Sequence, residues 1–223
     1  MTEQALAAVL WDFGGVILTS PFEAFNRYES QRGLPHDFLR SVNATDPDTN
    51  AWARFERSEI TSDHFDSLFA DESERLGHRV PGADVLGLLH GELRPEMVVA
   101  LDRVREAGLR TACLTNNVAG GDGQHSAFAG DTDPTGRRQL IADVMSRFDA
   151  VVESSKVGVR KPETRFYELA CELLDVTPSQ CVFLDDLGVN LKPAAAMGMR
   201  TIKVVSAQQA LDDLEGVLGF SVR

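Results

Sequence analysis

Polar side chains that could carry chemistry follow short apolar runs at several points along the chain. They are Asp12 after "AAVLW", Thr115 and Asn116 after "LRTACL", Lys161 before Pro162, and Asp185 with Asp186 after "CVFL". Runs of this kind are typical of buried parallel strands, and open parallel sheets bind ligands beyond the carboxyl ends of their strands. We therefore expect these side chains to meet at one edge of a sheet.

Asp12, Asp185 and Asp186 would place three carboxylates close together at that edge. Converging carboxylates repel one another strongly unless a cation lies between them. Because the candidates offer oxygen ligands and no cluster of His or Cys, Mg²⁺ is the ion that fits best. The pattern predicts a magnesium site, to which Gly14 could add its backbone carbonyl.

A carboxylate on Mg²⁺ beside a lysine and a hydroxyl is equipped to attack a phosphoryl group. Asp12 would be the nucleophile, Lys161 would offset the developing charge, and Thr115 with backbone N–H groups would hold the equatorial oxygens. Gly14 and Gly15 leave room beside Asp12 for the backbone to approach closely. The predicted chemistry is phosphoryl transfer through an aspartyl-phosphate.

Each of these residues also has an ordinary structural interpretation. Asp12 before two glycines could form a turn, and Thr115–Asn116 could open a loop. Lys161 could be a solvated charge, and Asp185–Asp186 could cap the helix that follows. The functional interpretation therefore rests on the whole set and not on any single member.

The elements expected to position these residues alternate between strand and helix. Apolar runs predict strands at "AAVLWDF", "LRTACLT", "DAVVES", "CVFLD" and "RTIKVV". Helical patterns cover residues 94–108, with Pro95 in the first turn, and residues 161–176, with Pro162 near the start. This alternation predicts an α/β fold, a doubly wound core with a mostly parallel sheet.

Residues 20–91 break the alternation, because they have helical periodicity and no convincing strand. This segment is far longer than an ordinary crossover connection. We expect a core domain of residues 1–19 and 92–223 with an inserted helical cap domain of residues 20–91. Asn116–Gln139 is rich in Gly and Asp and is expected to form a long loop.

Composition limits the classes of partner and location. The 223 residues carry a net charge of -12, so neither nucleic acid nor an anionic membrane surface is an expected partner. No basic run precedes the first apolar segment, and no apolar run approaches the ~20 residues of a membrane helix. The three cysteines lie in apolar patterns and are expected to be reduced. We expect a cytoplasmic monomer or homodimer that binds a small phosphorylated substrate.

A receiver domain of a two-component system uses a similar set of groups. A receiver has its acidic pair on the first strand and its lysine last, whereas this chain presents Asp, Thr, Lys and then Asp-Asp. The long helical insert would also have no place in a receiver. We therefore set that interpretation aside.

Four motifs in this order, "DFGGV", "LTN", "RKPE" and "FLDD", resemble those of the haloacid dehalogenase superfamily of hydrolases. The resemblance extends through nearly the whole chain and is greatest to the N-terminal phosphatase domain of soluble epoxide hydrolases. It implies that Asp12 is nucleophile and Mg²⁺ ligand, and that the Gly14 carbonyl is a second ligand. It further implies that Thr115 and Asn116 bind phosphate and that Lys161 stabilises negative charge. Asp185 with Asp186 would complete the metal site, and Asn190 would lie just behind these ligands.

Gly14 departs from the superfamily's phosphatase pattern, which usually has an acid two residues after the nucleophile. That acid protonates the leaving group, so its absence counts against a phosphatase, although some members of the superfamily with glycine at this position still look like phosphatases. Two alternatives remain: a catalytically weak or non-catalytic protein that binds metal and phosphate, and a dehalogenase-type hydrolase. The cap residues Arg54, Phe55 and His64 could select the substrate or simply pack.

Overall fold

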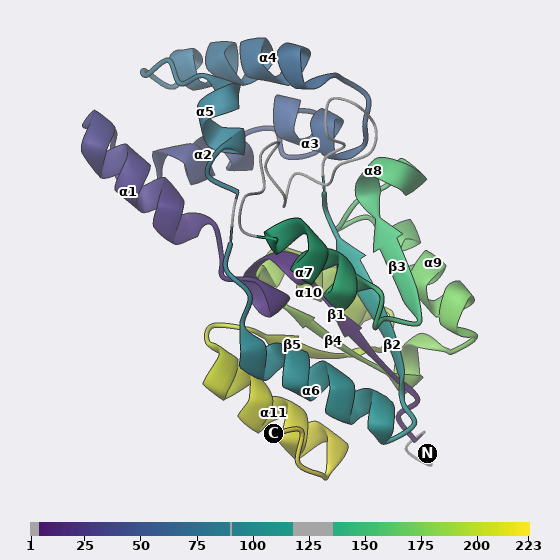
Figure 1. Ribbon diagram of the computed structural model, residues 1–223. Coiled ribbons are helices and arrows are strands. Elements are labelled where there is room, and N and C mark those ends of the chain that lie inside the picture. Colours follow the sequence, from purple (N-terminus) through teal and green to yellow (C-terminus); the bar gives the residue numbers. More distant parts are fainter. Residues whose placement is uncertain (1–4, 90, 118–135) are drawn as a thin grey trace.

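The computed structural model describes residues 5–89, 91–117 and 136–223. Its centre is a parallel five-stranded sheet with the strand order β3-β2-β1-β4-β5 (Figure 1). The strands are β1 (Ala8–Trp11), β2 (Arg110–Thr115), β3 (Ala150–Glu153), β4 (Cys181–Asp185) and β5 (Arg200–Lys203). All five lie within the runs predicted from the sequence. The chain therefore has the expected α/β fold.

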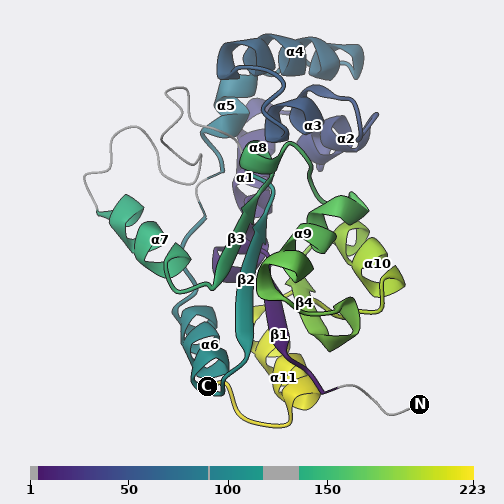
Figure 2. The same ribbon diagram turned by 90° about the vertical axis from the view of Figure 1, so that its right-hand side faces the viewer.

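Helices cover both faces of the sheet, as the side view shows (Figure 2). One face carries α6 (Pro95–Glu106), α7 (Arg137–Met145) and α11 (Ala207–Leu218), and the other carries α9 (Thr164–Leu174) and α10 (Gly188–Ala196). β1 and β4 are fully buried, which is why they read as continuous apolar runs rather than alternating ones. Two hydrophobic clusters result, one on each side of the sheet.

Between β1 and α6, the described residues form a helical turn at Phe13–Ile17 and then five α-helices. They are α1 (Phe22–Arg32), α2 (Phe38–Ala44), α3 (Ala51–Glu56), α4 (Ser62–Arg75) and α5 (Gly82–Leu86). They pack on a hydrophobic cluster of their own, in which Phe55, Phe65 and Phe69 are central. We call α1–α5 the cap, and it lies beyond the carboxyl ends of the strands (Figures 1 and 2).

Two chain segments join the cap to the sheet and pair with each other. Leu18 and Leu93 form an antiparallel bridge, and the backbone N–H of Arg94 donates to the carbonyl of Ile17 at 2.9 Å. The Arg94 guanidinium also donates to the Gly15 carbonyl at 2.9 Å. The connection is thus braced against the turn that follows β1.

Two local predictions need correction. The predicted loop Asn116–Gln139 runs too far, because α7 begins at Arg137, and its residues 118–135 lie outside the described part of the chain. Pro162 lies before α9, which begins at Thr164. Within the described residues, no helix is both long and apolar enough to cross a bilayer.

Candidate active site

Asp12 lies immediately after β1, in extended conformation, with only 7% of its surface exposed. Its Oδ1 accepts a hydrogen bond from the Phe13 N–H at 2.6 Å and lies 2.8 Å from the Lys161 ammonium. Two donors on one oxygen fix the orientation of the whole carboxylate. Burial raises the pKa of Asp12, the Lys161 charge opposes that shift, and the charges of Asp185 and Asp186 add to it.

The two glycines after Asp12 serve different purposes. Gly14 has φ -70° and ψ 131°, which any residue can adopt, whereas Gly15 has φ 79° in the left-handed region. A Cβ on Gly15 would lie 2.2 Å from Oδ2 of Asp186. Gly15 therefore makes both the turn and the space that Asp186 occupies.

Lys161 is the buried cation that connects the strand ends, and it is only 1% exposed. Its ammonium lies 2.8 Å from Oδ1 of Asp12 and donates to Oδ2 of Asp185, also at 2.8 Å. Burial alone would lower the pKa of Lys161, but the two carboxylates outweigh it and raise the pKa. The ammonium is therefore charged at any physiological pH.

Asp185 ends β4 fully buried, and its two oxygens face several donors. Oδ1 accepts from the Leu187 N–H at 2.8 Å and from the Asn190 amide at 3.0 Å. Oδ2 accepts from Lys161 at 2.8 Å and from Asn190 at 3.1 Å. These four contacts fill the acceptor capacity of a carboxylate. Asn190 thus contacts Asp185 directly, as expected for a residue one helical turn beyond the acidic pair.

Asp186 is less enclosed than Asp185. Its Oδ2 accepts a hydrogen bond from the Ser20 hydroxyl at 3.2 Å, and Ser20 lies on the segment that leads to the cap. Burial, followed by the charge of Asp185, raises the pKa of Asp186 to about 6. One oxygen from each of Asp12, Asp185 and Asp186 lies within 4.8 Å of the others. This is a set of hard oxygen donors whose repulsion a divalent cation would relieve.

Thr115 and Asn116 stand at the end of β2, next to β1 in the sheet. Thr115 is 1% exposed, and its hydroxyl has no hydrogen-bond partner among the described residues. The Asn116 side chain, in contrast, exchanges two hydrogen bonds with the backbone of Lys161 and donates to Glu56. The structure therefore brings all of the predicted site residues together at one edge of the sheet.

Three residues near this edge were missed by the sequence analysis: Ser20, Glu56 and Arg160. Arg160 belongs to the motif "RKPE", and Glu56 lies in the segment "FERSEIT" of residues 55–61, but a single sequence gives no signal that they meet. Of the cap residues considered for selectivity, Phe55 is 3% exposed and stacks on Phe65, so it packs in the cap. Contacts that cross between cap and core depend on tertiary structure alone.

Comparison with known proteins identifies the family. A family model described as haloacid dehalogenase-like hydrolase matches residues 6–198 of the chain. The chain is a haloacid dehalogenase-like hydrolase. The strand-end geometry of Asp12, Lys161 and Asp185 is therefore the candidate active site of a hydrolase.

Among its curated relatives, acyl-CoA dehydrogenase family member 10 of Mus musculus is 37% identical to the hydrolase over 218 residues, which is 96% of this chain and 19% of that protein. Bifunctional epoxide hydrolase 2 of Mus musculus is 31% identical over 227 residues, which is 96% of this chain and 39% of that protein. The chain thus spans less than half the length of either relative. Sesquiterpene phosphatase astK of Aspergillus oryzae is 24% identical over 219 residues, which is 95% of this chain and 96% of that protein. The expected resemblance to epoxide hydrolases is confirmed.

Solved structures resemble the hydrolase over most of its length. One is a haloacid dehalogenase family enzyme from Bacteroides thetaiotaomicron in complex with magnesium and inorganic phosphate. It matches 91% of this chain and 96% of that one, with a TM-score of 0.55 and 17% sequence identity. At this level of identity the match shows a shared fold.

Proposed function

We propose that this hydrolase is a Mg²⁺-dependent phosphatase that cleaves a small phosphomonoester through an aspartyl-phosphate on Asp12. The observation that carries the proposal is the Thr115 hydroxyl, which is buried at the strand ends without a partner among the described residues. An unpaired buried hydroxyl costs free energy, and a phosphoryl oxygen would satisfy it. Relatives that are named phosphatases, and the structural neighbour holding magnesium and phosphate, support the same conclusion.

The acidic residues fit a magnesium ion. Asp12, Asp186 and the Gly14 carbonyl would hold it, with Asp185 close by. Because Lys161, Leu187 and Asn190 already make four hydrogen bonds to the two oxygens of Asp185, we assign the direct contact to Asp186 and a positioning role to Asp185. When bound, the ion would neutralise charge on the transferring phosphoryl group.

The residues of the chain then act in a defined order. A carboxylate oxygen of Asp12 attacks phosphorus, the bond between phosphorus and the leaving oxygen breaks, and Lys161 offsets the developing negative charge. Thr115 and the backbone N–H of Asn116 hold phosphoryl oxygens, since the Asn116 side-chain amide is already engaged with Glu56 and Lys161. Water then attacks phosphorus, which releases phosphate and restores Asp12.

Gly14 offers no acid to protonate the leaving group. A positioned general acid–base contributes typically ~10² to 10⁴ in rate. A leaving group that departs as a stable anion should suffer least from its absence, so p-nitrophenyl phosphate should be cleaved faster than an unactivated alkyl phosphate.

We propose that residues 20–91 act as a cap domain on the core of residues 1–19 and 92–223, closing over a substrate bound at the strand ends.

A metal titration combined with a phosphatase assay tests the proposal. Hydrolysis of p-nitrophenyl phosphate should require Mg²⁺, stop on addition of EDTA, and resume when Mg²⁺ is restored. Binding of phosphate and metal without turnover would indicate a non-catalytic protein instead. Release of halide from a 2-haloacid that is indifferent to EDTA would indicate a dehalogenase.

A further inference from the structure

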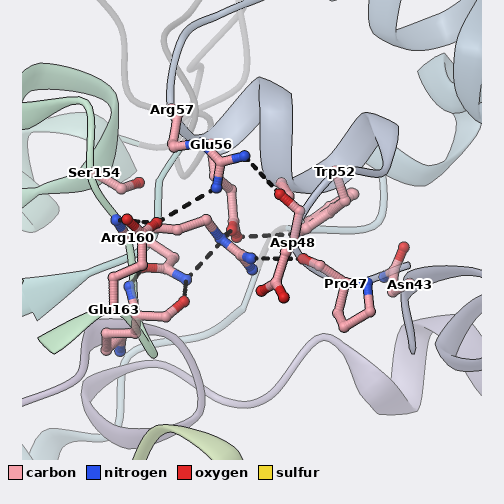
Figure 3. A network of polar contacts seen from close by, with 12 residues as sticks. Asn43, Pro47, Asp48, Trp52, Glu56, Arg57, Ser154, Arg160 and Glu163 are labelled. Atoms are coloured by element: carbon pink, nitrogen blue, oxygen red, sulfur yellow. Dashed lines mark hydrogen bonds and ion pairs between the residues drawn. The ribbon is translucent and has the colours of Figure 1, made fainter. Parts of the chain in front are cut away.

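Glu56 is a carboxylate of the cap that is buried against the core. It ends α3, is 5% exposed, and accepts hydrogen bonds on both oxygens. Its Oε1 accepts from the Trp52 indole at 2.9 Å, and its Oε2 accepts from Arg160 Nε at 2.5 Å and from the Asn116 amide at 3.2 Å. Figure 3 shows Glu56 at the centre of this network, between the cap helix and the core.

Asn116 carries the contact from Glu56 toward the catalytic lysine. Its Oδ1 accepts from the backbone N–H of Lys161 at 2.9 Å, and its Nδ2 donates to the backbone carbonyl of Lys161 at 3.0 Å. The side chain thus pairs with the Lys161 main chain as a neighbouring strand would. Because this pairing holds the residue at both polar backbone groups, it fixes the point from which the Lys161 ammonium reaches Asp12 and Asp185.

Glu56 supports the orientation in which the Asn116 amide pairs with the Lys161 main chain. In the observed orientation, the NH₂ group donates to Glu56 and to the Lys161 carbonyl, while the amide oxygen accepts from the Lys161 N–H. A flipped amide would turn its oxygen toward the Glu56 carboxylate and the Lys161 carbonyl, and its NH₂ group toward the Lys161 N–H. All three contacts would be repulsive, so the Glu56 carboxylate and the Lys161 main chain favour the same orientation.

We propose that Glu56 is a positioning residue of the active site, which orients Asn116 and thereby Lys161 only while the cap is seated. The inference rests on the proposed function in so far as Lys161 serves phosphoryl transfer. If the cap moves away, Glu56 moves with it, and the Asn116 amide keeps its two hydrogen bonds to Lys161 but loses the carboxylate that supports them. Cap closure and the placement of the catalytic ammonium are coupled through one carboxylate.

The next residue along the chain provides a matched control. Arg57 also reaches from cap to core, where its guanidinium lies 3.4 Å from Glu163. The carboxylate of Glu163 is 41% exposed, and an exposed ion pair of this kind contributes little. None of the hydrogen bonds and ion pairs described for Arg57 involves Asn116 or Lys161. Arg57→Gln therefore weakens the contact between cap and core at Glu163, whose Oε1 also accepts from the Arg160 N–H at 3.2 Å, while both hydrogen bonds between Asn116 and Lys161 keep their donors and acceptors.

The test compares the wild type, Glu56→Gln and Arg57→Gln by two measurements. Glutamine keeps the shape of Glu56 but replaces one acceptor oxygen by a donor, so the Trp52, Arg160 and Asn116 donors can no longer all be satisfied. Amide hydrogen exchange of the Lys161 N–H, followed by NMR, should be about tenfold faster or more in Glu56→Gln and unchanged in Arg57→Gln. The kcat for p-nitrophenyl phosphate should fall by about tenfold in Glu56→Gln with KM nearly unchanged, and it should stay within about twofold of wild type in Arg57→Gln.

Two results would overturn the proposal. Unchanged exchange of the Lys161 N–H in both Glu56→Gln and Glu56→Asp would mean that Glu56 does not hold this pairing. Equal acceleration in both variants would mean that Glu56 merely seats the cap. Should Glu56→Gln fail to fold, Glu56→Asp replaces it, because a side chain one methylene shorter cannot reach Asn116 and Arg160 together. If the Lys161 N–H of Glu56→Asp exchanged at the wild-type rate, the proposal would also be overturned. The exchange measurement needs no substrate, so a wild type that hydrolyses no phosphomonoester would refute the proposed function alone.

Discussion

The ends of the strands and the contact between cap and core are both networks of charge, but they are built differently. At the strand ends, Asp12, Lys161 and Asp185 are 7%, 1% and 0% exposed, and each is held by hydrogen bonds from fixed elements. At the cap contact, the Arg57–Glu163 pair joins side chains that are 16% and 41% exposed. Removing one member of a buried network lowers the free energy of unfolding by several kcal/mol, whereas removing one member of an exposed pair lowers it little.

The difference indicates what each network is for. A site that transfers a phosphoryl group needs its nucleophile and cation fixed before the substrate arrives, and burial in the sheet provides that. A cap that must admit a substrate needs contacts that can be broken and remade, and partly exposed ion pairs provide those. Glu56 is the exception, because it belongs to the cap but is about as buried as Asp12, Lys161 and Asp185.

Removal of the nucleophile's charge should have the largest effect. Asp12→Asn keeps the shape of the side chain but abolishes the charge that attacks phosphorus, so turnover should fall to background, a loss of about 10⁴-fold or more. Lys161 would still be paired with Asp185, so the fold should persist. Steady-state assays, with far-UV circular dichroism as the control, test this. A variant with substantial activity and native structure would mean that the nucleophile lies elsewhere.

Asp186→Asn should next separate metal binding from folding. Mg²⁺ that binds only the native protein raises its stability by about 2.7 kcal/mol at a hundred times the Kd. The wild-type Tm should therefore rise with Mg²⁺ concentration, and the rise should disappear in Asp186→Asn. Asp185→Asn is the matched comparison, because it weakens the hydrogen bonds around Lys161 and should lower Tm even without Mg²⁺. A wild-type Tm that is indifferent to Mg²⁺ would rule out the shared site.

The two glycines after Asp12 offer a smaller but sharper contrast. Gly15→Ala forces an alanine to φ 79° and directs its Cβ toward the Asp186 carboxylate, so stability should fall by roughly 1–2 kcal/mol and the response of Tm to Mg²⁺ should weaken. Gly14→Ala places the methyl group on a backbone of φ -70° and should change stability much less. Thermal unfolding with and without Mg²⁺ distinguishes the two. Equal losses in both variants would show that backbone conformation is not the determining factor.

The sequence predicted the strand ends well because local patterns determine them. Buried parallel strands read as continuous apolar runs, so the positions where those runs stop locate Asp12, Thr115 and Asp185. Lys161 could be added because it stands before Pro162 at the start of a predicted helix, where its ammonium could offset charge on a phosphoryl group. The order of the motifs then distinguished this architecture from that of a receiver domain.

The cap contact could not be predicted in the same way. Glu56 and Asn116 are separated by 60 residues, and Glu56 and Arg160 by 104, so no local periodicity relates them. The sequence also treats Gly14 and Gly15 alike, although only Gly15 has a positive φ. The resemblance implies that Asn116 binds phosphate, but the partners of its side chain come from two segments that only the folded chain brings together.

The central claim is that Asp12 carries the phosphoryl group, and trapping the covalent intermediate tests it most directly. The wild type is mixed with p-nitrophenyl phosphate and Mg²⁺, quenched in acid within the first turnover, and treated with hydroxylamine, which converts an acyl phosphate into a hydroxamate. Peptide mass spectrometry should then find the hydroxamate on Asp12 in the wild type and none in Asp12→Asn. A hydroxamate on a different carboxylate, or release of phosphate with no modified residue at any quench time, would contradict the account.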